Sequence, residues 1–190
     1  LAHASTALDL LMTDETGTAD ALAQELCTVN DERRRLEEHI FRAAMAAPEA
    51  EADGCSLVLA GDDWHAGVLG IVASRVQARL HRPVVLLCAE DEHTLKGSAR
   101  AGEGFDLVEA LDACAPMLLR HGGHRAAAGL TLAADTLPDF RAAFEAACAA
   151  QCGGVIAPPP LRVDVPAALT QVDHSLMQAL DRLEPFGHGN

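Results

Sequence analysis

The sequence predicts an α/β fold in which a mixed sheet is flanked by helices. Short apolar stretches alternate with helical patterns between residues 55 and 152, as expected when helices cover a sheet. The continuous apolar run from Pro83 to Ala89 is typical of a strand buried on both faces. Apolar residues make up 49% of the 190-residue chain, which is enough for a globular core.

Residues 1–54 are predicted to form a connector helix region. Apolar side chains recur at nearly helical spacing between residues 19 and 45, and the acidic stretch that follows ends the pattern. Arg33 and Arg34 precede Glu37 and Glu38 by four residues, so we expect ion pairs on a solvated face. A long helix entering a domain suggests a connector within a longer protein.

Residues 55–152 hold the predicted α/β domain. Asp62 and Asp63 follow the first strand, and we expect them to cap the next helix. Gly153 and Gly154 end the last helix. The predicted elements, in order, are a strand over 56–60, a helix over 66–80, strands over 83–89 and 94–100, a helix over 105–114, a strand over 125–132 and a helix over 137–151.

Residues 153–190 are predicted to be a linker and the beginning of a further, truncated region. Three consecutive prolines at 158–160 form a semi-rigid spacer. A strand-like alternation covers 161–165, and an amphipathic helical pattern covers 169–183. This segment is too short to bury a core of its own.

Composition limits the classes of function. No apolar run approaches the roughly 18 residues that span a bilayer, so we expect no membrane partner. Six scattered cysteines without a CxxC pair predict reduced thiols in a cytoplasmic protein and no metal site. The net charge of −14 argues against a broad electrostatic grip on nucleic acid. Residues 75–125 carry 7 acidic and 7 basic side chains, so a local anion site remains compatible with the total charge.

Two short motifs suggest a phosphate-binding surface. Ser98 and Arg100 follow Gly97 at the end of a predicted strand, and an Arg guanidinium matches the geometry of phosphate. Gly122 and Gly123 let a ligand approach the backbone, and His124 adds a hydrogen-bonding group.

Each of these motifs also has a structural interpretation. Arg100 is expected either to bind an anion or to pair with Asp106 or Glu103. The two glycines form either an anion-binding backbone or an ordinary turn. Trp64 and His65 lie before a helix start, where Trp64 is either a core anchor or part of the site.

No general-base pair, Ser/His/Asp arrangement or Walker loop accompanies these motifs. The residues therefore predict a phosphate-binding half-site without catalytic residues.

Five segments together resemble the RecJ-type single-stranded-DNA-specific exonucleases of the DHH phosphoesterase superfamily. They occur in the family's order and span nearly the whole chain. The segments are 64–75 (Trp-His-Ala-Gly-Val-Leu-Gly-Ile-Val-Ala-Ser-Arg), 97–100, 105–107, 122–129 and 183–190.

The resemblance implies a DHH-associated domain at 55–152 and the start of an OB-type region in 153–190. It implies a full-length enzyme that degrades single-stranded DNA from the 5′ end in DNA repair and recombination. Manganese or magnesium would be held by an N-terminal DHH domain whose motifs are absent from this sequence. The chain would therefore contain no catalytic residue and no metal ligand, and it would be inactive alone.

The resemblance also assigns roles to individual residues. Those expected to hold the DNA backbone opposite the metal centre are Ser98, Arg100, Gly122, Gly123 and His124, with His65 as a further candidate. Ala101 stands where the family usually has a second polar residue, which leaves one accessory contact unassigned.

Two alternatives stay open. In one, the chain is part of a phosphodiesterase of the same superfamily that hydrolyses oligonucleotides or cyclic dinucleotides. In the other, it is a noncatalytic module that docks other repair proteins through its acidic helix. We expect single-stranded DNA to be the partner of the RecJ-type enzyme, and other repair proteins to be the partners of the noncatalytic module.

Overall fold

The computed structural model describes residues 4–51, 53–156, 163 and 165–187. The chain forms two compact units, Leu1–Pro158 and Pro159–Asn190. The three-part division predicted from the sequence stays a prediction.

The first unit begins with helices. They are α1 (Ala4–Met12), α2 (Thr16–Ala46) and α3 (Pro48–Glu51), so the predicted long helix is confirmed. Arg33 pairs with Glu37 as expected, but Glu37 is buried, so this pair does not lie on a solvated face. Glu38 instead binds Arg42 and Arg75, whose side chains lower its pKa. Because Arg75 lies on α4 (Ala66–Leu80), this contact joins α2 to α4.

A five-stranded mixed sheet forms the centre of the unit, which confirms the predicted fold class. Its strands are β1 (Leu57–Gly61), β2 (Val84–Ala89), β3 (Thr94–Arg100), β4 (Leu118–His124) and β5 (Ala127–Ala133). Their order is β1-β2-β3-β5-β4, with β1 and β2 parallel and every other pair antiparallel. β4 is therefore an edge strand.

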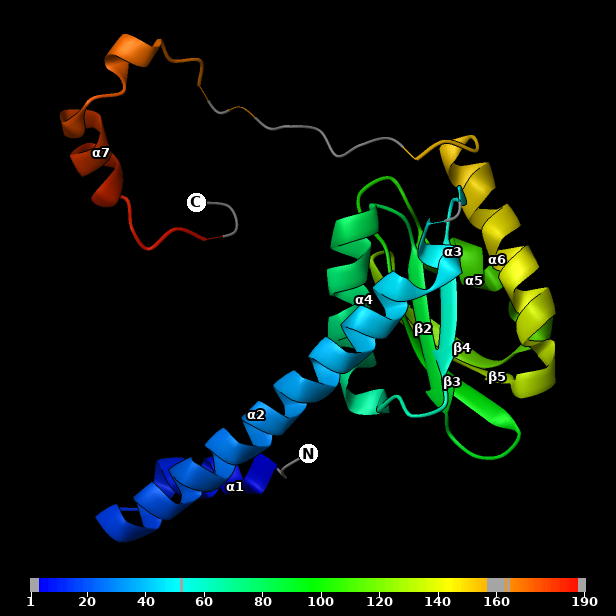
Figure 1. The fold of residues 1–190 in the computed structure, drawn as a ribbon, viewed down its shortest axis with the longest axis horizontal. Helices are drawn as coiled ribbons and strands as arrows, with labels where there is room; N and C mark the ends of the chain where they lie inside the picture. Colours follow the sequence, from blue (N-terminus) through cyan, green and yellow to red (C-terminus); the bar gives the residue numbers. More distant parts are fainter. Residues whose placement is uncertain (1–3, 52, 157–162, 164, 188–190) are drawn as a thin grey trace. The chain divides into compact units, whose positions relative to one another are not determined.

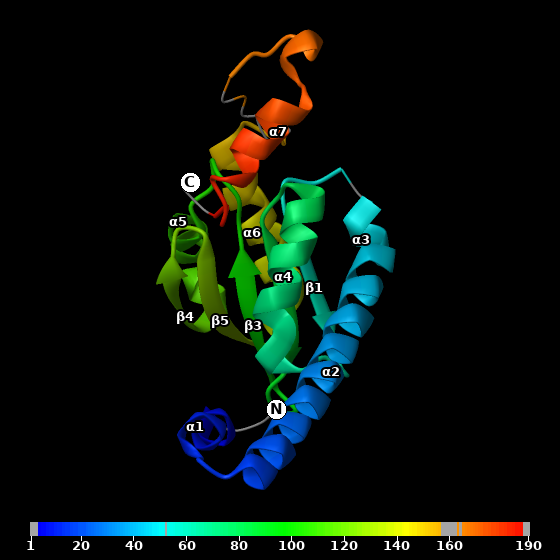
Figure 2. The ribbon, with the colours of Figure 1, turned by 90° about the vertical axis from the view of Figure 1, so that its left-hand side faces the viewer.

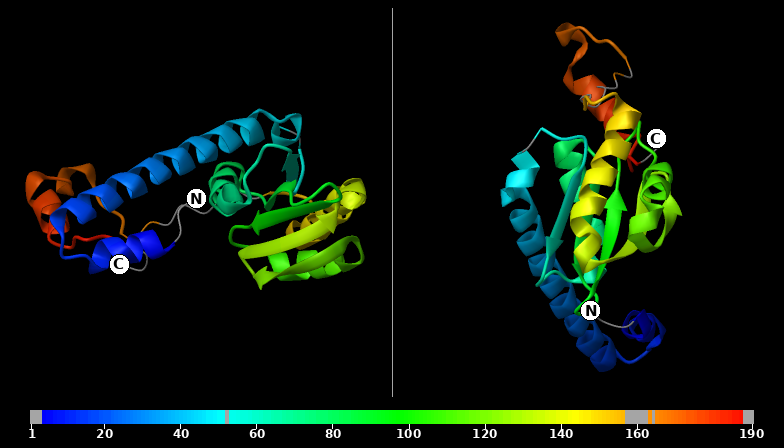
Figure 3. Two further views of the ribbon diagram at one scale, coloured as in Figure 1. Left: turned by 90° about the horizontal axis from the view of Figure 1, so that it is seen from below. Right: turned by 90° about the vertical axis from the view of Figure 1, so that its right-hand side faces the viewer.

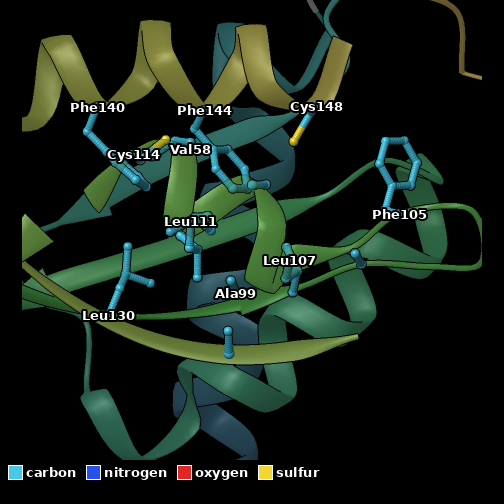
Figure 4. Close-up of a cluster of buried hydrophobic side chains, with 14 of the residues drawn as sticks. Val58, Ala99, Phe105, Leu107, Leu111, Cys114, Leu130, Phe140, Phe144 and Cys148 are labelled. Atoms are coloured by element: carbon cyan, nitrogen blue, oxygen red, sulfur yellow. The ribbon is translucent and has the colours of Figure 1, made fainter. Parts of the chain in front are cut away.

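Helices cover the two faces of this sheet. α4 (Ala66–Leu80) and α2 lie on one face, over a core that includes Leu57, Leu86 and Ile40. α5 (Leu107–Ala113) and α6 (Leu137–Cys152) lie on the other. Figure 4 shows Phe140 and Phe144 of α6 directed at this second core, with their ring centroids 5.6 Å apart. Short 3-10 turns, η1 (Ala115–Met117) and η2 (Ala134–Thr136), flank the β4–β5 hairpin.

The α4 face of the sheet is only partly covered. Figure 2 looks onto α4 and shows β5 and β4 beside this helix rather than beneath it. α1 and the first part of α2 extend beyond the sheet on the same side (Figures 1 and 3). We call the α4-side surface of β3, β5 and β4 the open face. Gly122, His124 and Gly129 are exposed there.

β4 is absent from the elements predicted from the sequence. The two glycines are predicted to form an anion-binding backbone or an ordinary turn before a strand at 125–132, yet Gly122, Gly123 and His124 belong to a strand. The hairpin turn is Arg125–Ala126. Two adjacent glycines disfavour a strand locally, and only the pairing with β5 reveals one.

The second unit contains η3 (Leu169–Gln171) and α7 (His174–Asp181), a shorter helix than the one predicted over 169–183. The Asp173 carboxylate caps α7 by accepting from the Leu176 amide. The expected strand at 161–165 lies largely outside the described residues, and the OB-type region stays a prediction. None of the described helices combines the length and apolar character needed to cross a bilayer.

Candidate functional site

Strand alternation places Ser98 and Arg100 on the same face of β3, beneath α4. A Cβ added to Gly70 of α4 would lie 2.5 Å from Arg100 Nη2 and 3.6 Å from Ser98 Oγ. Gly70 therefore leaves the space that the Arg100 side chain occupies between helix and sheet.

Arg100 is a half-buried cation. Its Nη1 donates to the Ala99 carbonyl at 2.8 Å, and burial lowers the pKa of the guanidinium. No carboxylate in the described part of the chain forms an ion pair with it. Asp106, one of its expected partners, instead caps α5 and lies 3.9 Å from Arg125. The Arg100 guanidinium thus has no carboxylate counter-ion among the residues that the structure describes.

The antiparallel register brings the predicted site residues together. Ser98 pairs with Gly129, and Gly129 pairs with Gly122, so these three form a row across β3, β5 and β4. The next row is formed in the same way by Arg100, Ala127 and His124. Segments separated by more than 20 residues therefore build one surface.

The glycines of this surface serve different purposes. Gly123 has a φ of 152°, and an added Cβ would lie 2.5 Å from the Ala127 carbonyl oxygen, so the fold requires glycine there. An added Cβ at Gly122 would meet nothing within 4 Å. At Gly129 the nearest atom would be the Gly97 oxygen at 3.8 Å, an ordinary contact. Packing therefore does not explain glycine at 122 or 129, two paired positions on the open face.

His124 is exposed at the end of β4, beside this glycine pair. His121 has a different place, because its Nε2 lies 2.8 Å from Asp112 Oδ1 of α5 on the opposite side of the strand. His121 thus ties β4 to α5, whereas His124 remains available to a ligand.

His65, and not Asp62 or Asp63 as the sequence predicts, caps the N-terminus of α4. Its Nδ1 accepts from the Gly67 amide at 3.0 Å, which makes His65 the N-cap of α4. The expected caps Asp62 and Asp63 do not perform this task, and Asp63 pairs with His39 at 2.8 Å. His65 takes the capping position in place of Asp62 and Asp63 because it immediately precedes the first residue of α4. No hydrogen bond or ion pair described in the structure joins His65 to Arg100 or His124.

Trp64 lies against Gly61 and packs on the core between α2, α4 and the sheet, as its core-anchor interpretation requires.

The chemistry of the open face suits binding rather than bond cleavage. It offers a guanidinium, a hydroxyl, an imidazole and unobstructed backbone, all of which match phosphate oxygens. Among the described residues, no group of three or more His, Cys, Asp or Glu is placed to hold a metal ion. No reaction step through a metal is therefore derived from these residues.

Residues 53–150 match the family model of the DHHA1 domain, and the chain belongs to this family. The single-stranded-DNA-specific exonucleases RecJ are its relatives. The chain is 33% identical to the Bacillus subtilis protein over 187 residues and 36% identical to the Thermus thermophilus protein over 197 residues. These alignments cover 97% and 100% of the chain but 24% and 27% of the relatives. The chain thus spans about a quarter of the length of the curated relatives it matches.

Solved structures give the same relationship. Thermus thermophilus RecJ in complex with Mg²⁺ matches with a TM-score of 0.81 and 35% identity, over 98% of this chain and 29% of that one. An exonuclease RecJ bound to manganese matches with a TM-score of 0.69 and 38% identity, over 77% of this chain and 36% of that one. The resemblance predicted from the sequence is confirmed, and these relatives bind divalent metals.

Proposed function

We propose that the chain is the substrate-binding part of a 5′–3′ single-stranded-DNA exonuclease of DNA repair and recombination. In this proposal residues 55–152 are the binding domain, residues 1–54 the connector and residues 153–190 a linker that begins an OB-type region. The observation that carries the proposal is the Gly122–Gly129 pair, which packing does not require, beside an Arg100 with no described counter-ion.

Each residue would contact the DNA backbone in a defined way. The Arg100 guanidinium and the Ser98 hydroxyl donate to phosphate oxygens, and His124 holds the same phosphate from the edge strand. Gly122, supported in its strand by Gly123, lets the DNA backbone approach the sheet closely. Contacts with phosphates carry no base information, which suits an enzyme that degrades any sequence. His65 reaches the DNA only through its Nε2, since Nδ1 caps α4.

The full-length enzyme would bind manganese or magnesium in a separate DHH domain. There the metal would lower the pKa of an attacking water and offset charge on the scissile phosphate. The residues of this chain would hold the DNA against that centre and would not cleave it alone. Six free thiols fit a reducing compartment, and we place the protein in the cytoplasm.

Binding of single-stranded DNA by the full-length protein in EDTA tests the proposal. Arg100→Ala should weaken affinity at least tenfold and reduce the salt dependence by about 0.7 in log–log slope for one lost phosphate contact. Arg141→Ala is the matched control, because it removes the same charge from α6 on the far face of the sheet. Unchanged affinity and slope in Arg100→Ala would overturn the proposal.

The purified 190-residue chain tests the lack of catalysis. With manganese and single-stranded DNA it should release no nucleotides above background. Robust manganese-dependent cleavage by the pure chain would contradict this part of the proposal.

Contact with other repair proteins is a second candidate function. The observation that favours it is the apolar surface of α1, where Leu8, Leu11 and Met12 are exposed. Pull-down of repair proteins with and without residues 1–50 tests it, and the Leu11→Ser, Met12→Ser variant repeats the test with α2 intact. Equal capture by all three proteins would exclude this role.

A further inference from the structure

A third row of polar side chains lies on the open face, next to the Ser98–Gly129–Gly122 row. Lys96 of β3 pairs with Thr131 of β5, and Thr131 pairs with Arg120 of β4. Strand alternation puts all three on the same face as Ser98 and Gly122. Lys96 and Arg120 are exposed, and Thr131 is half-buried between them. They line a hollow of about 340 Å³, together with Gly129.

The charge of this row is unusual for the chain. Lys96 is the only lysine among the 190 residues, whose net charge is −14. Its Nζ lies 3.1 Å from Glu90 Oε1, the one carboxylate among the described residues that line the hollow. Arg120 forms no ion pair with any carboxylate in the described part of the chain. Two cations on either side of a hydroxyl make a site for an anion.

Protection of the sheet edge does not account for the row. Charged side chains on an edge strand discourage pairing with other chains, and Arg120 on β4 fits that purpose. Lys96 lies on β3, which is paired on both sides, so edge protection gives no reason for a cation there.

The spacing of the rows matches a nucleotide chain. Successive side chains on one face of a strand are about 6.7 Å apart, which is close to the separation of successive phosphates in an extended nucleotide chain. The row of Lys96 therefore lies about two such steps from the row of Arg100 and His124, with the Ser98 row between them. Because the exposed residues Gly129 and Gly122 have no side chains, they do not obstruct the surface between the rows. We infer that Lys96, Thr131 and Arg120 bind a further backbone phosphate, about two nucleotides along the strand from the one held by Arg100 and His124. This inference rests on the proposed function and extends its site by about two nucleotides.

Replacement of Glu90 tests the inference through an expected gain in affinity for the nucleotide chain. Lys96 has to exchange its contact with Glu90 for one with phosphate, and the Glu90 carboxylate repels the incoming phosphate. Removing the negative charge should therefore raise affinity, whereas a purely structural Lys96–Glu90 pair would give no gain.

The experiment compares two ligands by calorimetry on the full-length protein in EDTA. The ligands are thymidine 5′-monophosphate, which has one phosphate, and the 5′-phosphorylated tetranucleotide of thymidine. Lys96→Ala and Arg120→Ala should each weaken binding of the tetranucleotide about fivefold and change binding of the monophosphate less than twofold. Glu90→Gln should strengthen binding of the tetranucleotide about twofold. Arg141→Ala is the charge-matched control, and thermal melting checks that each variant is folded.

Modification of Lys96 gives an independent readout on the unmutated protein. Acetylation of Lys96 by an N-hydroxysuccinimide ester, followed by peptide mass spectrometry, should slow at least fivefold when the tetranucleotide is bound. The monophosphate should give no protection.

The outcomes separate the two hypotheses. If Arg100→Ala weakens the tetranucleotide while Lys96→Ala and Arg120→Ala do not, the inference is overturned and the proposed function stands. Equal losses for the monophosphate and the tetranucleotide also overturn it, because all residues would then hold one phosphate. If Arg100→Ala is without effect as well, the proposed function fails.

Discussion

Gly70→Ala should stabilise the helix that carries it and weaken the site beneath. Alanine is favoured over glycine in a helix by up to about 1 kcal/mol. The new Cβ would lie 2.5 Å from Arg100 Nη2, whereas carbon and nitrogen atoms in contact are usually about 3.5 Å apart. The guanidinium therefore has to move by about 1 Å. It is the flexible end of a side chain, so the fold accepts the change.

The displacement should reduce the affinity for single-stranded DNA. Hydrogen bonds to charged groups contribute about 1.5–3 kcal/mol, so loss of the Arg100 contact corresponds to roughly a 10- to 100-fold weaker complex. Fluorescence anisotropy in EDTA measures the affinity of the full-length protein, and urea unfolding measures stability. The variant should have an equal or higher urea midpoint together with the weaker binding.

Two further variants isolate the cause. Gly17→Ala on α2 is the matched control, because an added Cβ there meets nothing within 4 Å, and binding should be unchanged. The double variant Gly70→Ala, Arg100→Ala should bind no more weakly than Arg100→Ala, since both changes act on one contact. Additive losses in the double variant, or full affinity in Gly70→Ala, would refute the reasoning.

Gly123→Ala should destabilise the fold by about 2–4 kcal/mol, since it adds both a strained φ and a clash with the Ala127–Ala128 backbone. Gly122→Ala should unfold at the same urea concentration as the unmutated protein and lose affinity for DNA. Equal stabilities for the two variants would contradict the assignment of Gly123 to the fold and Gly122 to DNA binding. Alkaline pH should lower stability through Cys114, because burial raises the pKa of its thiol to about 11 from 9.0. The folded state holds this proton more tightly, so the contribution is complete below pH 9 and is lost as pH rises to about 11. Cys114→Ala should show a smaller decline of the urea midpoint between pH 8 and 10.5, and an unchanged decline would exclude Cys114 as a cause.

The elements with strong local signals could be predicted from the sequence. The buried run at 83–89 and the helix at 66–80 were found within one residue of β2 and α4, because apolar pattern and length agree at both places. The site residues Ser98 and Arg100 were identifiable because a serine and an arginine follow a glycine at a strand end. Their placement beside Gly122 and His124 depends on the β3–β5–β4 register, which no local pattern contains.

Features that depend on tertiary contacts were missed. Gly70 matters because Arg100 reaches it from another element, and Gly129 matters because of its pairing with Gly122. The two cations of the third row, Lys96 and Arg120, lie on two strands that are not neighbours. A sequence-only search for basic clusters therefore overlooks it. The sequence signal that could have revealed this row is the single lysine of an acidic chain.

The position of β4 at the edge of the sheet has a consequence for dynamics. β4 is bonded to β5 alone, its side chains are mostly exposed, and His121–Asp112 is its one described side-chain hydrogen bond to a helix. Separation of β4 from β5 would remove only the packing of Leu118 from one core and leave the other four strands in place, so this strand should open at a lower free energy than global unfolding. Half of the binding surface would then exist only while β4 is closed. A bound DNA strand that bridges β3 and β4 should act as a clamp across the hairpin and slow amide exchange in residues 118–124 more than in β2.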